Sequence, residues 1–364
     1  MNTIPVDVKK KHNFFAGPAI LPAPVLEEAA QAALQFGDMG LSILEISHRS
    51  PQFKAVLEEA IQLTRELLNV SDAYEVLFLT GGASSQFFMS AMNLLNTDET
   101  ACYVDTGSWS TKAIKEAKHF GQVEVLASSK AQNFNHIPKD YSIPDTAKYL
   151  HLTSNNTIYG TQYHWWPETT VPFVCDMSSD IFSRPLDIDR FGLIYAGAQK
   201  NLGPAGTTLV IVRKDLLGKV DRAIPTMLNY QTHIDKGSAF NTPPAYPIYV
   251  CMLTMRWLKA QGGIAAMEAQ NKRKAALLYD EIDNNPCFQG TAAKEDRSLM
   301  NVTFVMNNPD HEAAFLAICE AADCVGIKGH RSVGGFRASI YNAMSYESVE
   351  VLVDLMKTFG AKHG

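Results

Sequence analysis

Apolar and polar positions divide this chain into two parts with different rhythms. Up to about residue 244, short apolar runs alternate with segments in which apolar residues recur every three or four positions, as in amphipathic helices. The runs predict strands over residues 76–79, 101–105, 123–126, 149–152, 171–176, 193–196 and 209–212. Helices are predicted over 25–36, 51–68, 86–95 and 109–120, and a short extended piece over 43–46. This order predicts an α/β fold with a mostly parallel seven-stranded sheet covered by helices.

The pattern changes after the prolines at 243–244. Helices are predicted over 248–259, 264–283, 311–322 and 346–359, and strands over 300–305 and 336–340. Because strands are fewer here and mixed with helices, we expect a smaller α+β domain. We place the boundary at Gly262, which predicts a large cofactor-binding domain at 14–261 and a small C-terminal domain at 262–364. Residues 1–13 are predicted to be either a flexible arm or packed with the small domain.

The composition of the chain argues against nucleic acid, a membrane or a metal ion as a partner. The net charge of −6 and the pI near 5.9 indicate no basic surface for nucleic acid. The N-terminus lacks an apolar leader and no apolar run approaches the roughly 18 residues of a membrane span, so we expect a cytoplasmic protein without membrane contact. None of the six cysteines forms a C-x-x-C pair, which favours free thiols in a reducing compartment and predicts no metal site.

Four polar features follow predicted strands. They are the glycine turn at 80–85 (TGGASS), Trp109, Asp176 and Lys200. Ligands of open α/β sheets bind at the carboxyl ends of the strands, so these features are expected to share one site. The glycine turn leads into a helix and can hold a phosphate on backbone N–H groups, although a plain strand-to-helix turn has the same pattern. Trp109 can stack on a flat ligand, or it can belong to the core.

Lys200 and Asp176 carry the strongest chemical signal. Lys200 stands on a Gly-rich turn between two apolar runs, where it is either an ordinary turn residue or a desolvated lysine that forms a Schiff base. Asp176 ends an apolar strand, where it either caps a following helix or pairs with a ring nitrogen of a cofactor. Together they fit the Schiff-base lysine and the pyridinium partner of pyridoxal 5′-phosphate.

Two His-Arg sequences indicate an anionic substrate. They occur at 47–50 (SHRS) and at 329–332 (GHRS), both in predicted loops. A guanidinium beside an imidazole suits a phosphate, although either sequence alone is compatible with a surface loop. Arg337, in a predicted strand, needs an anionic partner if it is half-buried, and a substrate carboxylate would serve.

In several of these segments the chain resembles the phosphoserine aminotransferase family. The resemblance covers about residues 14–362 and is carried by 15–18, 45–49, 196–206, 240–244 and 329–343. It implies a fold-type-I aminotransferase that is a homodimer with shared active sites. It also implies ping-pong transfer of an amino group from L-glutamate to 3-phosphohydroxypyruvate, giving O-phospho-L-serine and 2-oxoglutarate in serine biosynthesis. Some members also act on a phosphorylated threonine precursor, forming 4-phosphohydroxythreonine in vitamin B6 biosynthesis.

The resemblance also implies a role for each site residue. Lys200 matches the catalytic Schiff-base lysine and Asp176 its catalytic partner at the ring nitrogen. The other cofactor contacts would be Ala83, Ser84, Trp109, Thr157, Gln199, Asn241 and Thr242, the last two reaching in from the other subunit. The substrate-binding residues would be His48, Arg49, His330, Arg331 and Arg337. Some members carry an arginine at the position of Ser84, so the contribution of that residue to phosphate binding stays open.

Three other classes of protein explain the sequence less well than a phosphoserine aminotransferase does. An aminotransferase that uses alanine or serine with glyoxylate would share the fold but have no reason for two His-Arg loops. A cysteine desulfurase would need a nucleophilic cysteine on a mobile loop, whereas Cys319 and Cys324 fall on or beside a predicted helix. A cofactor-binding regulatory protein would need a DNA-binding extension, which the sequence does not indicate.

Overall fold

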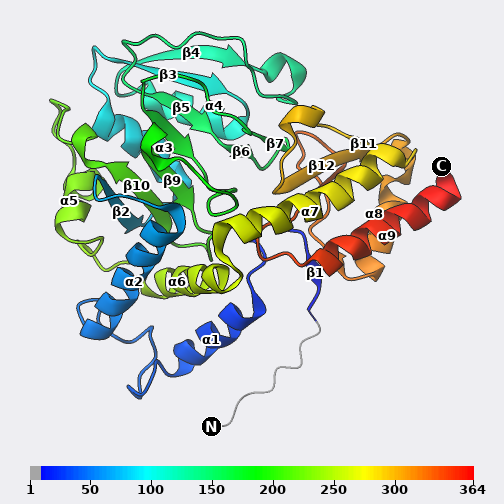
Figure 1. Cartoon of the computed structure of the whole chain (residues 1–364), viewed down its shortest axis with the longest axis horizontal. Helices are drawn as coiled ribbons and strands as arrows, with labels where there is room; N and C mark the ends of the chain where they lie inside the picture. The colour runs from blue at the N-terminus through cyan, green and yellow to red at the C-terminus, as the bar shows by residue number, and fades with distance from the viewer. Residues whose placement is uncertain (1–9) are drawn as a thin grey trace.

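A seven-stranded sheet forms the centre of the molecule, seen in a computed structural model that describes residues 10–364 (Figure 1). Its order is β2 (Tyr74–Leu79), β10 (Thr208–Arg213), β9 (Phe191–Gly197), β8 (Phe173–Asp176), β5 (Leu150–Thr153), β3 (Thr100–Asp105) and β4 (Gln122–Ser128). Strand β10 runs antiparallel to both neighbours, and the remaining pairs are parallel. The predicted sheet is confirmed.

Helices cover both faces of this sheet. The apolar cluster on one face takes in α1 (Ala23–Leu34), α2 (Pro51–Leu68) and α6 (Ala245–Ala260). The cluster on the other takes in α3 (Gly82–Leu94), α4 (Ser108–Ala117) and α5 (Tyr230–Asp235). Successive side chains of a strand point to opposite faces, so Phe78 packs in the first cluster and Leu77 in the second. Both are buried, which explains why central strands such as β8 and β9 are mostly apolar rather than alternating.

The C-terminal part has its own sheet. Strands β11 (Phe288–Gly290), β12 (Asn301–Met306) and β14 (Phe336–Ser339) pair antiparallel. They pack on α7 (Gly263–Asn284), α8 (Glu312–Ala321) and α9 (Tyr346–His363), to the right in Figure 1. Contacting aromatic rings fill the space between these layers, from Phe288, Phe304, Phe315, Phe336 and Phe359.

The segment around residues 10–22 joins the two parts. Strand β1 (His12–Asn13) pairs parallel with β13 (Cys324–Val325), and Phe14 lies in the apolar cluster of the C-terminal part. Residues 1–9 of the predicted arm lie outside the described residues. At the predicted boundary, Gly262 has a φ of +92° between α6 and α7, while Ile264 and Met267 still pack in the large cluster. The division into 14–261 and 262–364 stays a prediction.

Two local predictions were wrong. Residues 43–46 form a turn rather than an extended piece, because Ser42 and Glu45 bond to nearby backbone: Glu45 Oε2 accepts from Ser42 N and Ser42 Oγ accepts from Leu44 N. Helix α3 begins at Gly82, earlier than the predicted residue 86. The positive φ values of Gly81 and Gly82, +98° and +67°, let the chain turn directly from β2 into the helix.

Several short elements were not predicted from the pattern of apolar residues. They include α5, β6 (Asn155–Asn156), β7 (Thr161–Gln162), β11 and several 3₁₀ turns. Elements this short do not span a full hydrophobic period. Among the described residues, no helix is both long and apolar enough to cross a bilayer.

Candidate active site

A cavity of about 720 Å³ opens at the carboxyl ends of β2, β8 and β9. It brings together most of the residues predicted for the cofactor and the substrate. Those that line it are Ala83, Ser84, Trp109, Thr157, Asp176, Gln199, Lys200, His330, Arg331 and Arg337. The first seven come from the part of the chain that carries the seven-stranded sheet and the last three from the C-terminal part, so the two parts meet at the site.

Asp176 is a buried carboxylate held from one side. It ends β8, and its Oδ1 accepts hydrogen bonds from Ser178 N at 2.9 Å and Ser178 Oγ at 2.6 Å. Ser178 Oγ in turn accepts from Gly197 N at the end of β9, at 3.0 Å. Burial raises the pKa of Asp176, against the lowering effects of Lys200 and Ser178. The turn that follows is not a helix, so the alternative of a helix cap was wrong.

Lys200 is the cation facing this carboxylate. It lies in the turn after β9, and its Nζ donates to Thr157 Oγ1 at 2.7 Å. Burial lowers the pKa of Lys200 to about 8, which the nearby Arg337 assists and Asp176 opposes. An amine with this pKa is unprotonated in roughly a tenth of the molecules at pH 7, far more than a lysine with the ordinary pKa near 10.4, and nucleophilic attack on a carbonyl requires that neutral form.

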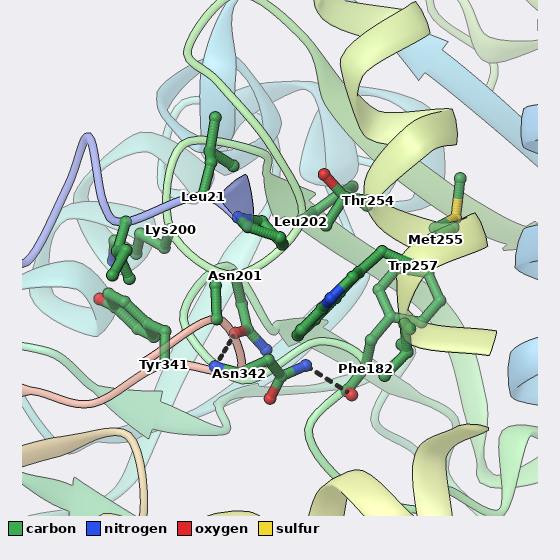
Figure 2. Close-up of a pocket in the computed structure, with 14 residues that line it drawn as sticks. Leu21, Phe182, Lys200, Asn201, Leu202, Thr254, Met255, Trp257, Tyr341 and Asn342 are labelled. Carbon is green, nitrogen blue, oxygen red and sulfur yellow. Dashed lines mark hydrogen bonds between the residues drawn. The ribbon is translucent and has the colours of Figure 1, made fainter. Parts of the chain in front are cut away.

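The lysine turn is anchored from behind. Asn201 Nδ2 donates to Ile181 O at 2.6 Å, and Asn201 Oδ1 accepts from Asn342 N at 3.0 Å. Asn342 Nδ2 donates to Phe182 O at 2.9 Å, and the two hydrogen-bonded asparagines lie next to each other in the lining of a small cavity that Lys200 also lines (Figure 2). These bonds tie the lysine turn to the loop after β14, because Asn342 follows that strand.

The glycine turn presents unsatisfied backbone donors to the cavity. Gly81, the N-cap of α3, has no side chain to bond the first amides of the helix, and Gly82, Ala83 and Ser84 line the cavity. The first N–H groups of a helix lack intrahelical partners and carry the positive end of the dipole. This turn fits the phosphate of the predicted cofactor, and backbone amides supply the donors whatever residue occupies position 84.

The opposite wall is cationic. His330 and Arg331 lie in the segment 329–335, which we call the anion loop, and Arg337 follows on β14. Arg337 Nη1 donates to Thr157 O at 3.3 Å, while its buried Nε has no partner in the described structure. Burial first, and then Arg337, Arg331 and Lys112, lower the pKa of His330. None of the three side chains pairs with a carboxylate of the described residues, so the wall can receive an anion.

Trp109 completes the site from the first turn of α4. It lines the cavity, and Lys200 Nζ lies 5.3 Å from the centroid of its ring. Its buried Nε1 has no partner among the described residues, an opening that a ligand can fill. Trp109 also packs against two apolar clusters, so stacking on a ligand stays a prediction for this residue.

Four predicted residues do not line this cavity. They are His48, Arg49, Asn241 and Thr242. His48 and Arg49 lie in a turn before α2, and Asn241 lines a separate cavity near β2. Exposed apolar side chains adjoin both groups: Leu44 is 64% exposed and Phe240 is 39% exposed.

Sequence reasoning missed several residues that shape the site. Ser178 fixes Asp176, Asn201 fixes the lysine turn, and Lys112 lines the cavity beside Trp109. Asp176 and Ser178 are two residues apart, as in an Asx turn, so the sequence could have predicted that the backbone near Ser178 bonds the Asp176 carboxylate. Lys112 had no such signal, because an exposed lysine on a helix is common.

The two cysteines of the desulfurase alternative are inaccessible. Cys319 lies on α8 and Cys324 on β13, and both are buried. Burial raises the pKa of Cys319 to about 12 and that of Cys324 to about 11, so neither is a ready nucleophile.

Comparison with known proteins agrees with this geometry. Residues 12–352 match the family Aminotransferase class-V. The chain is 60% identical to phosphoserine aminotransferase of Parabacteroides distasonis over 356 residues, covering 97% of this chain and 100% of that one. It is 59% identical over 349 residues to the enzyme of Flavobacterium psychrophilum, covering 96% and 98%. A solved phosphoserine aminotransferase, in which radiation damage of the Schiff base was examined, is 50% identical with a TM-score of 0.94, covering 98% and 100%.

The sheet, the strand-end lysine and aspartate, and the class-V match define a transaminase that depends on pyridoxal phosphate. Identity above one half over almost the whole chain narrows the class further. The chain belongs to the phosphoserine aminotransferase family.

Proposed function

We propose that this enzyme transfers the amino group of L-glutamate to 3-phosphohydroxypyruvate, giving O-phospho-L-serine and 2-oxoglutarate. The observation that carries the proposal is one cavity with the desolvated Lys200 and Asp176 on one wall. On the other wall lie His330, Arg331 and Arg337, which have no carboxylate partner among the described residues. The first wall suits amino transfer, and the second suits a substrate with two anionic groups.

The residues present fit pyridoxal phosphate. The orphan amides of the glycine turn would hold its phosphate, with Gln199 alongside, and Trp109 would stack on its ring. Thr157 would hydrogen-bond the ring oxygen, and Asp176 would keep a proton on the ring nitrogen. When bound, the cofactor supplies an electron sink that stabilises negative charge at the substrate Cα.

Lys200 Nζ does the proton chemistry. With cofactor and substrate bound, the ε-amine of Lys200 would accept the proton of the substrate Cα as general base and would then give it back as general acid. Thr157 Oγ1, 2.7 Å away, holds Nζ in position. The low pKa of Lys200 suits it to act as a base near neutral pH, since a lysine with an ordinary pKa would stay protonated.

Two different anions must bind at the same cationic wall. Arg337 would take the α-carboxylate that both substrates carry. His330 and Arg331 would take the phosphate of one substrate or the γ-carboxylate of the other. Since the phosphate carries more charge, it gains more from the same donors. The phosphorylated threonine precursor of vitamin B6 has the same two anionic groups and is a second proposed substrate.

We infer that the working enzyme is a homodimer. His48 and Arg49 would join the substrate site, and Asn241 and Thr242 the cofactor phosphate, from a second copy. Support comes from the fact that none of the four lines the cavity of its own chain, and from the exposed Leu41, Leu44 and Phe240 beside them. A cytoplasmic location is proposed on the six free, buried thiols.

An acceptor panel tests the substrate. With glutamate fixed as donor, initial rates are compared for 3-phosphohydroxypyruvate, pyruvate and glyoxylate at equal concentrations. The phosphorylated acceptor is expected to have the highest kcat/KM. Preference for pyruvate or glyoxylate would overturn the substrate and leave the class of enzyme unchanged.

A further inference from the structure

The cavity contains one cation that the proposed roles leave unused. Lys112, in the first turns of α4, lines the same cavity as His330, Arg331 and Arg337. Its side chain is exposed, which places it at the mouth rather than at the base. It has no carboxylate partner among the described residues.

The position of Lys112 is set by Trp109. Its Nζ lies 4.5 Å from the centroid of the Trp109 ring, where the negative face of the indole attracts a cation. Trp109 is itself half-buried against α3 and its neighbours, so it forms a fixed platform. An exposed lysine normally samples many rotamers, and this contact favours those directed at the cavity.

The charged residues that line the cavity are mostly cations, so the place of Lys112 among them affects how anions bind. Its lining includes Lys112, Lys200, Arg331 and Arg337, and Asp176 is its only carboxylate among the described residues. Lys112 comes from the large domain, whereas His330 and Arg331 come from the anion loop of the C-terminal part. Lys112 also acts electrostatically on His330, whose pKa it helps to lower. An anion beside His330 therefore lies within the field of both parts.

We propose that Lys112 is a specificity-determining residue that favours the phosphorylated substrate over glutamate by facing the anion loop from the large domain. The inference rests on the proposed function. Its physical basis is that a fixed cation interacts with a group in proportion to the charge of that group, so a phosphate dianion gains about twice the free energy that a carboxylate gains.

Lys112→Gln tests this. We expect KM for 3-phosphohydroxypyruvate to rise about tenfold with kcat within about twofold, and the glutamate half-reaction to lose about threefold in kcat/KM. Lys112→Arg keeps the charge and should restore the wild-type discrimination. Lys115→Gln removes a lysine from the same helix that does not line the cavity, and is the matched control.

A binding measurement separates charge from support of Trp109. Titration calorimetry of the cofactor-loaded enzyme with inorganic phosphate should show a Kd about tenfold weaker in Lys112→Gln and unchanged in Lys115→Gln. If Lys112 only supports Trp109, cofactor affinity would fall, both substrates would lose equally, and phosphate binding would not change. That pattern would overturn the proposal.

The comparison of acceptors distinguishes an error in the proposed function from an error in the role of Lys112 alone. A wild-type enzyme that prefers an unphosphorylated acceptor removes the proposed function and this inference with it. A wild-type enzyme that prefers the phosphorylated acceptor, with the same preference in Lys112→Gln, overturns the role of Lys112 alone.

Discussion

The two walls of the cavity differ in how their polar groups are satisfied. At the strand ends, Asp176 bonds Ser178 and Lys200 bonds Thr157, and the lysine turn is anchored through Asn201. In the anion loop, the bonds are mainly between backbone groups, such as Gly329 N to Gly335 O, and the side chains of His330 and Arg331 lack a carboxylate partner. The side chains of Asp176 and Lys200 are therefore hydrogen-bonded before any substrate binds, whereas those of the anion loop have no anionic partner among the described residues.

This difference follows from the chemistry each wall performs. Proton transfer requires groups held within hydrogen-bond reach in fixed orientations, and a buried network provides this. A site that must accept both a phosphate and a carboxylate needs donors that can adjust, and an exposed loop provides that. We therefore expect changes at the strand ends to reduce both half-reactions together, and changes in the anion loop to separate them.

The largest expected effect is at Lys200. Lys200→Ala removes both the attachment point and the base, so transamination should fall by at least about 10⁴-fold for either substrate. Steady-state rates and the half-reaction absorbance would measure it. Lys236→Ala, an exposed lysine on the same domain, is the control. Turnover within tenfold of wild type would refute the proposed mechanism.

A smaller loss is expected for Asp176→Asn. The amide cannot hold a positive charge on the ring nitrogen, so both half-reactions should slow on the order of 10³-fold while the cofactor still binds. Single-turnover rates and cofactor content check this. Asp187→Asn changes an exposed carboxylate and should have no effect. An unchanged rate would mean that Asp176 has only a structural role.

Arg331→Ala should separate the half-reactions. We expect a loss of about a hundredfold in kcat/KM for 3-phosphohydroxypyruvate and about tenfold for glutamate, because donors bind a dianion more strongly than a monoanion. Lys328→Ala, exposed just before the same loop, is the control. Equal losses for both substrates would contradict a difference in function between the walls.

The smallest effect is a pH dependence of cofactor loading. Only the neutral amine of Lys200 reacts, and its pKa is about 8. The loading rate of cofactor-free enzyme should rise about tenfold per pH unit up to about 8 and then level off, whereas a free lysine derivative keeps rising towards its pKa near 10.4. Asp176→Asn should lower the midpoint, since Asp176 raises the pKa of Lys200. A rise that continues beyond pH 10 would contradict a desolvated lysine.

Most strands and helices of the fold were predictable, because the pattern of apolar and polar positions along the chain reflects which faces of each element are buried. Strands such as β9 and β10 are apolar at almost every position, which only a sheet covered on both faces requires. Helix α2 spans the residues predicted for it from its apolar periodicity. Pro51 starts it, after the N-cap Ser50, and Asn69 ends it in a left-handed conformation. Residues 43–46 failed because side chains bonded to nearby backbone overrode an apolar pattern.

The sequence alone determined which chemistry this chain carries, since a lysine on a Gly-rich turn, a strand-end carboxylate and two His-Arg pairs are properties of residue type and order. Only the tertiary structure decided which of these meet. It joined Lys200 and Asp176 to His330, more than a hundred residues further along the chain, and left His48 and Arg49 outside the cavity. It also gave Lys112 a place at the mouth. The reason is that proximity across loops depends on how the sheet and the C-terminal part pack, which local patterns do not encode.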